Sequence, residues 1–379
     1  MNRSQAICSA ISKNYISFAR TLCRSFLKQH PDGIHYVLIT DESEGYVDPQ
    51  AESFEIITLE DLRIPDPKRF CFQYDVMELA TATKPYLLDY LLKEKQVERV
   101  LYLDPDIYVT GSLDALFEML DTADILLTPH TDQDYPEDGL LPNELLLFRY
   151  GIYNLGFIGV KASENTGAFL NWWKHKLYDR CVTKPGFGYF VDQKFIDLAA
   201  VLFDNIRIVK DPGYNVAWWN IHCRRITRNG KGWLCNNLPL GFFHFSSYQP
   251  HRPDSLTSQQ NRVPLSDMPD LQALLVEYRQ QLLSHGYDET INWPYDHDYF
   301  TSGEKIEPSV RQMYRENPDR AAAYGDPFES QALKAWMARD KRVNYFKEEF
   351  RKAVRRVVRL ETRESLRRFW RSGSFKLAL

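Results

Sequence analysis

The sequence predicts an α/β fold in which a largely parallel sheet is covered by helices on both faces. Short apolar, β-branched runs alternate with segments of helical periodicity as far as residue 128. A chain of 379 residues is also long enough for one large α/β domain with an extension. With 44% apolar and 26% charged residues, the composition is that of an ordinary globular protein.

The predicted elements up to residue 128 follow one another in a regular order. Strands are expected over residues 5–11, 34–40, 54–59, 99–103 and 124–128, and helices over 15–26, 79–92 and 113–120. The first helix must end before Pro31. Pro85 has to lie in the first turn of the second helix or break it.

Beyond residue 135 the pattern becomes less regular. We expect a loop over 136–144, a strand over 153–160 that Gly156 and Gly159 interrupt, and helices over 168–177 and 192–202. A strand and turn over 206–215, a strand over 240–246 and a polar connector over 249–269 lead to a helix over 271–283. Residues 294–332 look turn-rich, and a basic helical pattern follows.

Two carboxylates directly after the strand 99–103 are the strongest chemical signal. Asp104 and Asp106 flank Pro105, and side chains two residues apart in an extended chain point the same way. Ligands of open α/β sheets bind beyond the carboxyl ends of the strands, and converging carboxylates attract a hard divalent cation such as Mn²⁺ or Mg²⁺. Asp-Pro-Asp is also common in surface turns, so the spacing alone leaves both interpretations open.

The surroundings of this pair resemble glycosyltransferases with the GT-A fold, over roughly residues 4–250. Asp104-Pro105-Asp106 is similar to their aspartate-any-aspartate motif, and the sequence VDQKFID at 191–197 resembles the Asp-Gln helix start of glycosyltransferase family eight. The strand GFFHFS at 241–246 resembles the one that carries that family's histidine ligand. The resemblance implies a Rossmann-like, mixed central sheet with flanking helices, a nucleotide-sugar donor and an Mn²⁺ or Mg²⁺ ion.

The same resemblance implies which residues hold the donor and the metal. His244 would join Asp104 and Asp106 as a metal ligand, although a lone histidine in an aromatic strand is otherwise typical of a core position. The resemblance also implies a set of residues that bind the donor. They lie on the first strand, on the helix after it, on the helix TATKPYLLDYLL, on the strand YNLGFIGV and at the aspartate pair: Ser9, Ile11, Tyr15, Lys84, Asn154, Asp104 and Asp106. The donor expected is a UDP-sugar, with GDP-sugars left open.

Asp192 and Gln193 are the expected catalytic residues, although the pair also suits a plain helix start. A retaining enzyme would use them to steady the oxocarbenium-like carbon, and an inverting one would use Asp192 as general base. Family-eight enzymes follow the histidine with Gly and Lys-Pro, whereas this chain has no lysine there and offers Arg252 instead. The sequence therefore leaves the stereochemical outcome open.

The acceptor is expected to be a glycan or a lipid-linked sugar in bacterial polysaccharide biosynthesis. Asn215 offers an amide donor and acceptor, and Trp219 and His222 could face a sugar ring. Each of the three could equally be a turn or packing residue, as could Trp218.

We expect three regions: a GT-A domain over 1–250, a helical and turn-rich extension over 251–332, and a basic amphipathic tail over 333–379. From Arg339 onward the charge is +9, which leaves −13 for the rest of the chain. The acidic body argues against nucleic acid as a partner. The tail suits either peripheral contact with an anionic membrane or docking on the acidic body. No signal peptide or membrane span is evident, so a cytoplasmic enzyme, at most at the inner face of the membrane, is expected.

Three other classes of protein differ from a glycosyltransferase in what they would do or require. A catalytically decayed sugar-binding protein of the same fold would bind nucleotide without turnover. A membrane scaffold would act mainly through the tail. A nucleotidyltransferase would need a glycine-rich loop after the first strand, where the chain instead has Ser12-Lys13-Asn14-Tyr15.

Overall fold

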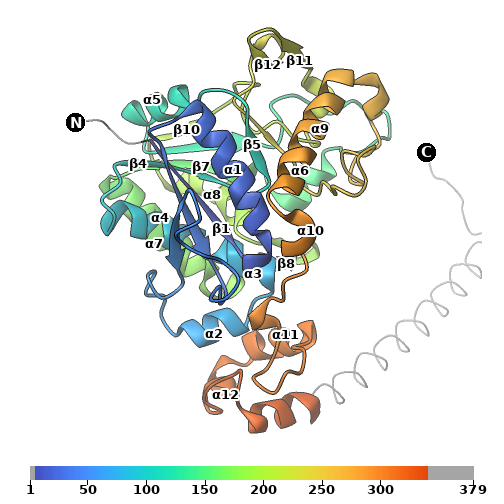
Figure 1. Ribbon diagram of the computed structural model, residues 1–379. Coiled ribbons are helices and arrows are strands. Elements are labelled where there is room, and N and C mark those ends of the chain that lie inside the picture. The colour runs from blue at the N-terminus through green and yellow to red at the C-terminus, as the bar shows by residue number, and fades with distance from the viewer. Residues whose placement is uncertain (1–4, 340–379) are drawn as a thin grey trace, which may run out of the picture. The chain divides into compact units, whose positions relative to one another are not determined.

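The computed structural model describes residues 5–339, which fall into two compact units that meet between Tyr299 and Phe300. The first unit contains a seven-stranded sheet (Figure 1). In spatial order its strands are β10 (Ile206–Ile208), β6 (Ile125–Pro129), β7 (Tyr153–Lys161), β4 (Arg99–Leu103), β1 (Ala6–Ile11), β2 (Ile34–Ile39) and β3 (Glu55–Thr58). The strands predicted from the sequence are all present, within one or two residues at most ends.

The sheet is largely parallel, as expected, and one antiparallel strand makes it mixed, as the resemblance to GT-A enzymes implies. Strand β7 runs antiparallel to both β4 and β6, while the other pairs are parallel. Strand β7 runs on through both glycines, so the interruption expected at Gly159 is wrong, whereas its register with β6 shifts between Tyr153 and Ile158, a stretch that includes Gly156. Gly156 lies against the ring of His244 and Gly159 lies against Leu101, so each glycine makes room for a neighbouring side chain.

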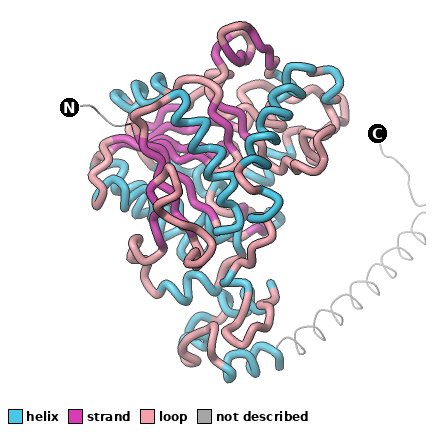
Figure 2. The backbone as a smooth tube through the Cα atoms, viewed as in Figure 1, coloured by secondary structure: helices cyan, strands magenta, loops and turns pink. Residues whose placement is uncertain are grey.

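Helices cover both faces of the sheet (Figure 2). On one face α1 (Ile16–Gln29) and α5 (Asp114–Thr122) pack their apolar side chains on β1, β4 and β6. On the other lie α3 (Val76–Ala82), α4 (Lys84–Lys93), α7 (Glu164–Arg180) and α8 (Gln193–Leu202). The single helix expected over 79–92 is two helices, with Pro85 in the first turn of α4 and Thr83 between them.

The remaining elements of the first unit are short, apart from one helix. They are α2 (Pro67–Phe72), β5 (Ile107–Val109), α6 (Leu145–Tyr150), β8 (Thr183–Lys184), β9 (Tyr189–Phe190), β11 (Ile226–Asn229), β12 (Gly232–Cys235), β13 (Leu238–Pro239), β14 (Phe242–His244) and α10 (Tyr287–Thr290). The helix α9 (Pro269–Ser284) packs on the aromatic cluster around Phe243, Phe245 and Tyr278. Strands β5 and β14 pair with each other outside the main sheet.

The second unit contains α11 (Pro308–Glu316), α12 (Pro318–Ala322) and helical residues 331–339. The expectation that residues 294–332 are mainly turns is therefore wrong for α11 and α12, each of which starts with a proline in its first turn. The region boundaries expected at 250 and 332 stay predictions. Residues 340–379, and so nearly all of the predicted basic tail, lie outside the described part. Within residues 5–339 no helix is both long enough and apolar enough to cross a bilayer.

Candidate active site

The turn between β4 and β5 presents the two aspartates predicted from the sequence. Strand β4 ends at Leu103, and the Asp104 amide donates to the Gly156 carbonyl at 2.8 Å. The Ile107 amide donates to the Asp104 carbonyl at 3.0 Å and so closes the turn. These backbone hydrogen bonds fix the turn Asp104-Pro105-Asp106, and with it the backbone positions from which the two carboxylates project.

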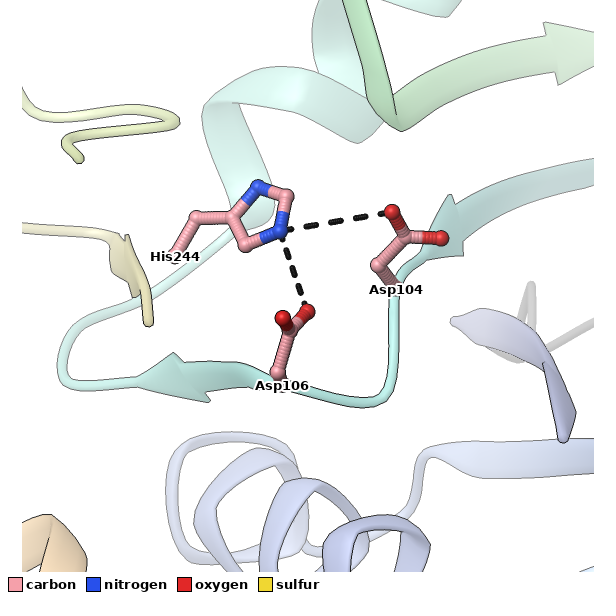
Figure 3. Close-up of side chains that lie close together, drawn as sticks. All are labelled: Asp104, Asp106 and His244. Carbon is pink, nitrogen blue, oxygen red and sulfur yellow. Dashed lines mark ion pairs between the residues drawn. The ribbon is translucent and has the colours of Figure 1, made fainter. Parts of the chain in front are cut away.

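The pairing of β14 with β5 brings His244 to this turn. His244 lies opposite Ile107 in the antiparallel register, and the Phe245 amide donates to the Asp106 carbonyl at 2.9 Å. The His244 Nε2 atom is then 3.0 Å from Asp106 Oδ1 and 4.0 Å from Asp104 Oδ2 (Figure 3). Ligand atoms of all three residues lie within 4.8 Å of one another.

Asn215 determines which nitrogen of His244 faces the aspartates. The Asn215 amide nitrogen donates to Thr128 Oγ1 at 2.7 Å and to Asn154 Oδ1 at 3.0 Å. Its Oδ1 lies 3.2 Å from His244 Nδ1, so this oxygen accepts a hydrogen bond from Nδ1–H. A neutral His244 therefore carries its proton on Nδ1 and leaves the Nε2 lone pair directed at the aspartates, as a metal ligand requires.

The three side chains fit a divalent cation. Two carboxylates and one neutral imidazole are the donor set that suits Mn²⁺, and Mg²⁺ also accepts carboxylate ligands. Burial opposes a charge on the imidazole, but Asp106 and Asp104 outweigh it and raise the pKa of His244 above its ordinary value. A bound cation would compete with this proton for Nε2, so binding of a metal here is expected to release it.

A buried lysine connects the aspartates to the predicted catalytic residue. Lys84 Nζ lies 3.3 Å from Asp104 Oδ1 and 3.0 Å from Asp192 Oδ2, and it donates to the Leu155 carbonyl at 2.8 Å. The side chains of Lys84 and Asp192 are both 2% exposed. Burial raises the pKa of the Asp192 carboxyl to about 6, against the lowering effect of Lys84.

Gln193, the other predicted catalytic residue, is held by backbone groups at both ends of its amide. Its Nε2 donates to the Tyr150 carbonyl at 2.8 Å, and its Oε1 accepts from the Leu155 amide at 3.3 Å. Asn154 is likewise occupied, because its Oδ1 accepts from both Gly156 and Asn215. Both side chains are thus part of a rigid wall.

These groups line a cavity of about 530 Å³. Ten of the predicted site residues line it, nine of which were predicted for the donor, the metal or catalysis: Ile11, Tyr15, Lys84, Asp104, Asp106, Asn154, Asp192, Gln193 and His244. Trp219, predicted to contact the acceptor, lines it as well, and its ring meets that of His244 edge-on at 5.1 Å. The structure therefore gathers most of the predicted residues around one space.

Three predicted site residues do not line the cavity. Ser9 is fully buried, where its hydroxyl donates to the Leu103 carbonyl at 2.8 Å and lies 3.0 Å from His35 Nε2. Asn215 is 1% exposed and acts behind His244, as described above. His222 lies against the ring of Tyr135, at 4.6 Å between centroids. The roles predicted for these three stay predictions.

Sequence reasoning missed several side chains of the cavity wall. His130 follows β6, faces Trp219 and lies 3.5 Å from the Asn154 amide nitrogen, and burial lowers its pKa to about 4. The rings of Tyr150 and Phe190 contact each other in a tilted arrangement, with 4.5 Å between their centroids. A polar residue directly after a buried strand was the available signal for His130, since it occupies the same kind of position as Asp104.

The sequence of this chain is similar to a known protein family and to two curated proteins. Residues 6–157, somewhat less than half of the chain, match Glycosyl transferase family 8. Uncharacterized protein YfnF of Bacillus subtilis (strain 168) is 26% identical over 292 residues, which cover 74% of this chain and 94% of YfnF. Uncharacterized protein YfnD of the same organism is 22% identical, over 59% of this chain and 71% of YfnD.

Among solved structures, the chain is similar to the glycosyltransferase GlyE of Streptococcus pneumoniae TIGR4, with 18% identity and a TM-score of 0.43 over 79% of this chain and 67% of GlyE. It is also similar to the galactosyltransferase LgtC in complex with donor and acceptor sugar analogs, with 16% identity and a TM-score of 0.42 over 73% of this chain and 95% of LgtC.

Proposed function

We propose that this glycosyltransferase, which is similar to those of family eight and has the GT-A fold, transfers a sugar in a metal-dependent reaction from a UDP-sugar to a glycan or lipid-linked acceptor of a polysaccharide pathway. The observation that carries the proposal is the convergence of Asp104, Asp106 and His244 on one wall of the cavity. A cation held there would act as a Lewis acid that stabilises the charge on the leaving diphosphate.

The donor half of the cavity is bounded by the end of β1 and the start of α1. Ile11, Ser12 and Tyr15 line this side, and the Tyr15 ring stacks on Phe18 at 4.7 Å. An aromatic ring supported from behind in this way offers a flat face to a nucleotide base. We favour uracil because UDP-sugars are the usual donors of this fold, and the wall itself carries no contact that would reject guanine.

The diphosphate would be held without the lysine that family-eight enzymes place after the histidine. Arg252 does not line the cavity, whereas Ser246 and Ser247 do. They form the centre of a turn that the hydrogen bond from the Tyr248 amide to the Phe245 carbonyl closes at 2.9 Å, with Ser247 at a φ of 62°. Hydroxyls and amides at such a turn suit phosphate oxygens. Of the described residues that line the cavity, only Lys84 is a lysine or an arginine.

Asp192 and Gln193 would act on the sugar itself. The buried ion pair with Lys84 holds Asp192 in place, and backbone hydrogen bonds hold Gln193. Rigid groups of this kind stabilise developing charge without reorganising. Both stereochemical outcomes fit these residues, because Asp192 could serve as a base in an inverting reaction or steady the anomeric carbon in a retaining one.

Release of nucleotide from nucleotide-sugars tests the proposal. Wild-type protein would be incubated with UDP-glucose, UDP-galactose or GDP-mannose in Mn²⁺, in Mg²⁺ or in EDTA. We expect slow metal-dependent release of UDP, lost in EDTA and reduced at least a hundredfold in Asp106→Asn, while Asn at the exposed Asp32 leaves it unchanged. Metal-dependent nucleotide binding without any release of nucleotide would favour a catalytically decayed protein. Release of nucleotide that EDTA does not change would contradict the proposed dependence on a metal ion.

A further inference from the structure

An exposed apolar rim borders the cavity and has no role in the donor site. It consists of Met77, Leu145, Phe148 and Phe187, whose side chains are 46%, 52%, 73% and 84% exposed. We propose that this apolar rim seats the hydrocarbon chain of a lipid-linked acceptor while its sugar end enters the cavity. The inference rests on the proposed function and narrows its acceptor to an amphiphile.

The rim is one surface, although its members come from three segments. Helix α6, which carries Leu145 and Phe148, packs on β9 and on the 3-10 turn Pro185–Phe187. The β8–β9 hairpin is tied to α3 by the Thr183 amide, which donates to Glu78 Oε1 at 3.0 Å. Met77, the neighbour of Glu78 on α3, lines the cavity, and Phe187 lies in the connection between the two strands of this hairpin.

The same segments also form part of the cavity wall, and this continuity identifies the occupant. Helix α6 directs Leu146 and Tyr150 to the cavity and leaves Leu145 and Phe148 in solvent. The hairpin does the same with Phe190 inside and Phe187 outside, and Met77 belongs to both surfaces. A ligand that contacts both must be polar at the end near the metal and apolar at the end on the rim.

The apolar surface continues beyond the mouth along α8. The Ile152 amide donates to Asp197 Oδ1 at 2.7 Å, which joins the end of α6 to that helix. Ile152 is 49% exposed, and Leu198 and Val201 on α8 are 52% and 85% exposed. Gln193 at the start of α8 lines the cavity, and a helix rises about 1.5 Å per residue, so Val201 lies roughly 12 Å farther along the helix. That reach suits a long chain rather than a small apolar substituent.

The charge around the rim favours a single chain over an anionic bilayer. Glu144 precedes α6 and Arg149 lies near its end, and both are exposed, so the segment with α6 carries one exposed charge of each sign. Surfaces that bind anionic membranes carry an excess of lysine and arginine. Exposed apolar patches of soluble proteins mark binding sites for apolar ligands or partners, and here the adjoining cavity supplies the polar half of the site.

Binding of n-dodecyl-β-D-maltoside monomers, compared with maltose, tests the inference. Calorimetric titration below the micelle concentration should show saturable binding of the detergent to the full chain. The double variant Phe148→Ser/Phe187→Ser should bind it at least tenfold more weakly. The control Leu238→Ser/Val276→Ser, which changes two apolar residues that are each 45% exposed and lie away from the cavity wall, should bind as wild type does.

Binding of dodecyl maltoside by the rim variant at wild-type affinity would overturn the proposal. So would a wild-type dimer that the rim substitutions dissociate without any saturable detergent binding, because the rim would then be a surface for a second copy. Flotation with phosphatidylglycerol vesicles that the rim substitutions abolish, again without binding of detergent monomers, would assign the rim to a bilayer. UDP binding with Mn²⁺ in the same samples reports separately on the proposed function, and both double variants should retain it.

Discussion

Gly156 is the position at which a single methyl group should disable the metal site. A Cβ atom built there lies 2.2 Å from His244 Cε1 and 2.6 Å from His244 Nδ1. The first distance is more than an ångström shorter than the 3.4 Å at which ordinary contacts begin. The new Cβ would also lie 2.8 Å from Asn154 Oδ1, so it cannot move away from His244 toward Asn154. Asn154 in turn accepts a hydrogen bond from Asn215. Gly156→Ala must therefore displace the imidazole.

The expected magnitudes follow from this clash. Overpacking of a close-packed interior costs about 1–3 kcal/mol, which should appear in the free energy of unfolding from urea titration. The displaced His244 would lose its 3.0 Å approach to Asp106 Oδ1, so affinity for Mn²⁺ in the presence of UDP should fall at least tenfold, or about 1.4 kcal/mol.

Gly167→Ala is the matched control for this substitution. Gly167 lies inside α7, and a Cβ there meets nothing within 4 Å. Alanine should stabilise that helix by about 0.5–1 kcal/mol and leave Mn²⁺ binding unchanged. If Gly156→Ala binds Mn²⁺ and UDP as wild type does, the placement of His244 against β7 is refuted.

Three further predictions concern groups around the site and Asp41, which lies just beyond the end of β2. Asn215→Ala removes the acceptor that fixes the His244 ring, and should lower Mn²⁺ affinity 10–100-fold by calorimetry; an unchanged affinity would deny Asn215 its orienting role. Lys84→Met leaves Asp192 buried without its ion pair and should cost about 3–5 kcal/mol of unfolding free energy, and a loss below 1 kcal/mol would argue that the pair is not buried in solution. Burial raises the pKa of Asp41 to about 6, so the folded state binds this proton more tightly than the unfolded state and loses up to about 3 kcal/mol as pH rises from 4 to 7. Asp41→Asn should remove that contribution from urea titrations across this range, and parallel pH profiles of variant and wild type would contradict it.

Local signals in the sequence were sufficient for most of the sheet and for the aspartate pair. Each strand that precedes residue 130 is an apolar run with clear ends, and Asp104 and Asp106 directly follow one of them. A polar residue directly after an apolar run can be recognised from a few neighbouring residues. The position of such a residue at the end of a strand can therefore be predicted without knowing the fold.

Long-range pairing accounts for what the sequence could not show. His244 meets Asp106 only because β14 pairs with β5, and those strands are more than 130 residues apart in the chain. The antiparallel direction of β7 is likewise a matter of its pairing with β4 and β6, which its own composition does not show. From residues alone His244 could have been a core histidine, and it was the resemblance to family eight that proposed it as a ligand.

Asn215 illustrates the same limit for a side chain. Its amide was expected to contact the acceptor, since an asparagine amide offers sugar hydroxyls both a donor and an acceptor. In the structure it is buried, and its side chain hydrogen-bonds to Thr128, Asn154 and His244. Only the convergence of three distant segments reveals that this amide faces the histidine ring.

Calorimetric titration of UDP and GDP with and without Mn²⁺, into wild type and Asp106→Asn, tests the central claim most directly. We expect UDP to bind wild type in a manner that requires Mn²⁺, and to lose that binding in the variant because one of the three ligands is gone. Nucleotide binding that needs no metal and survives Asp106→Asn would contradict the claim that Asp104, Asp106 and His244 hold a metal-bound diphosphate.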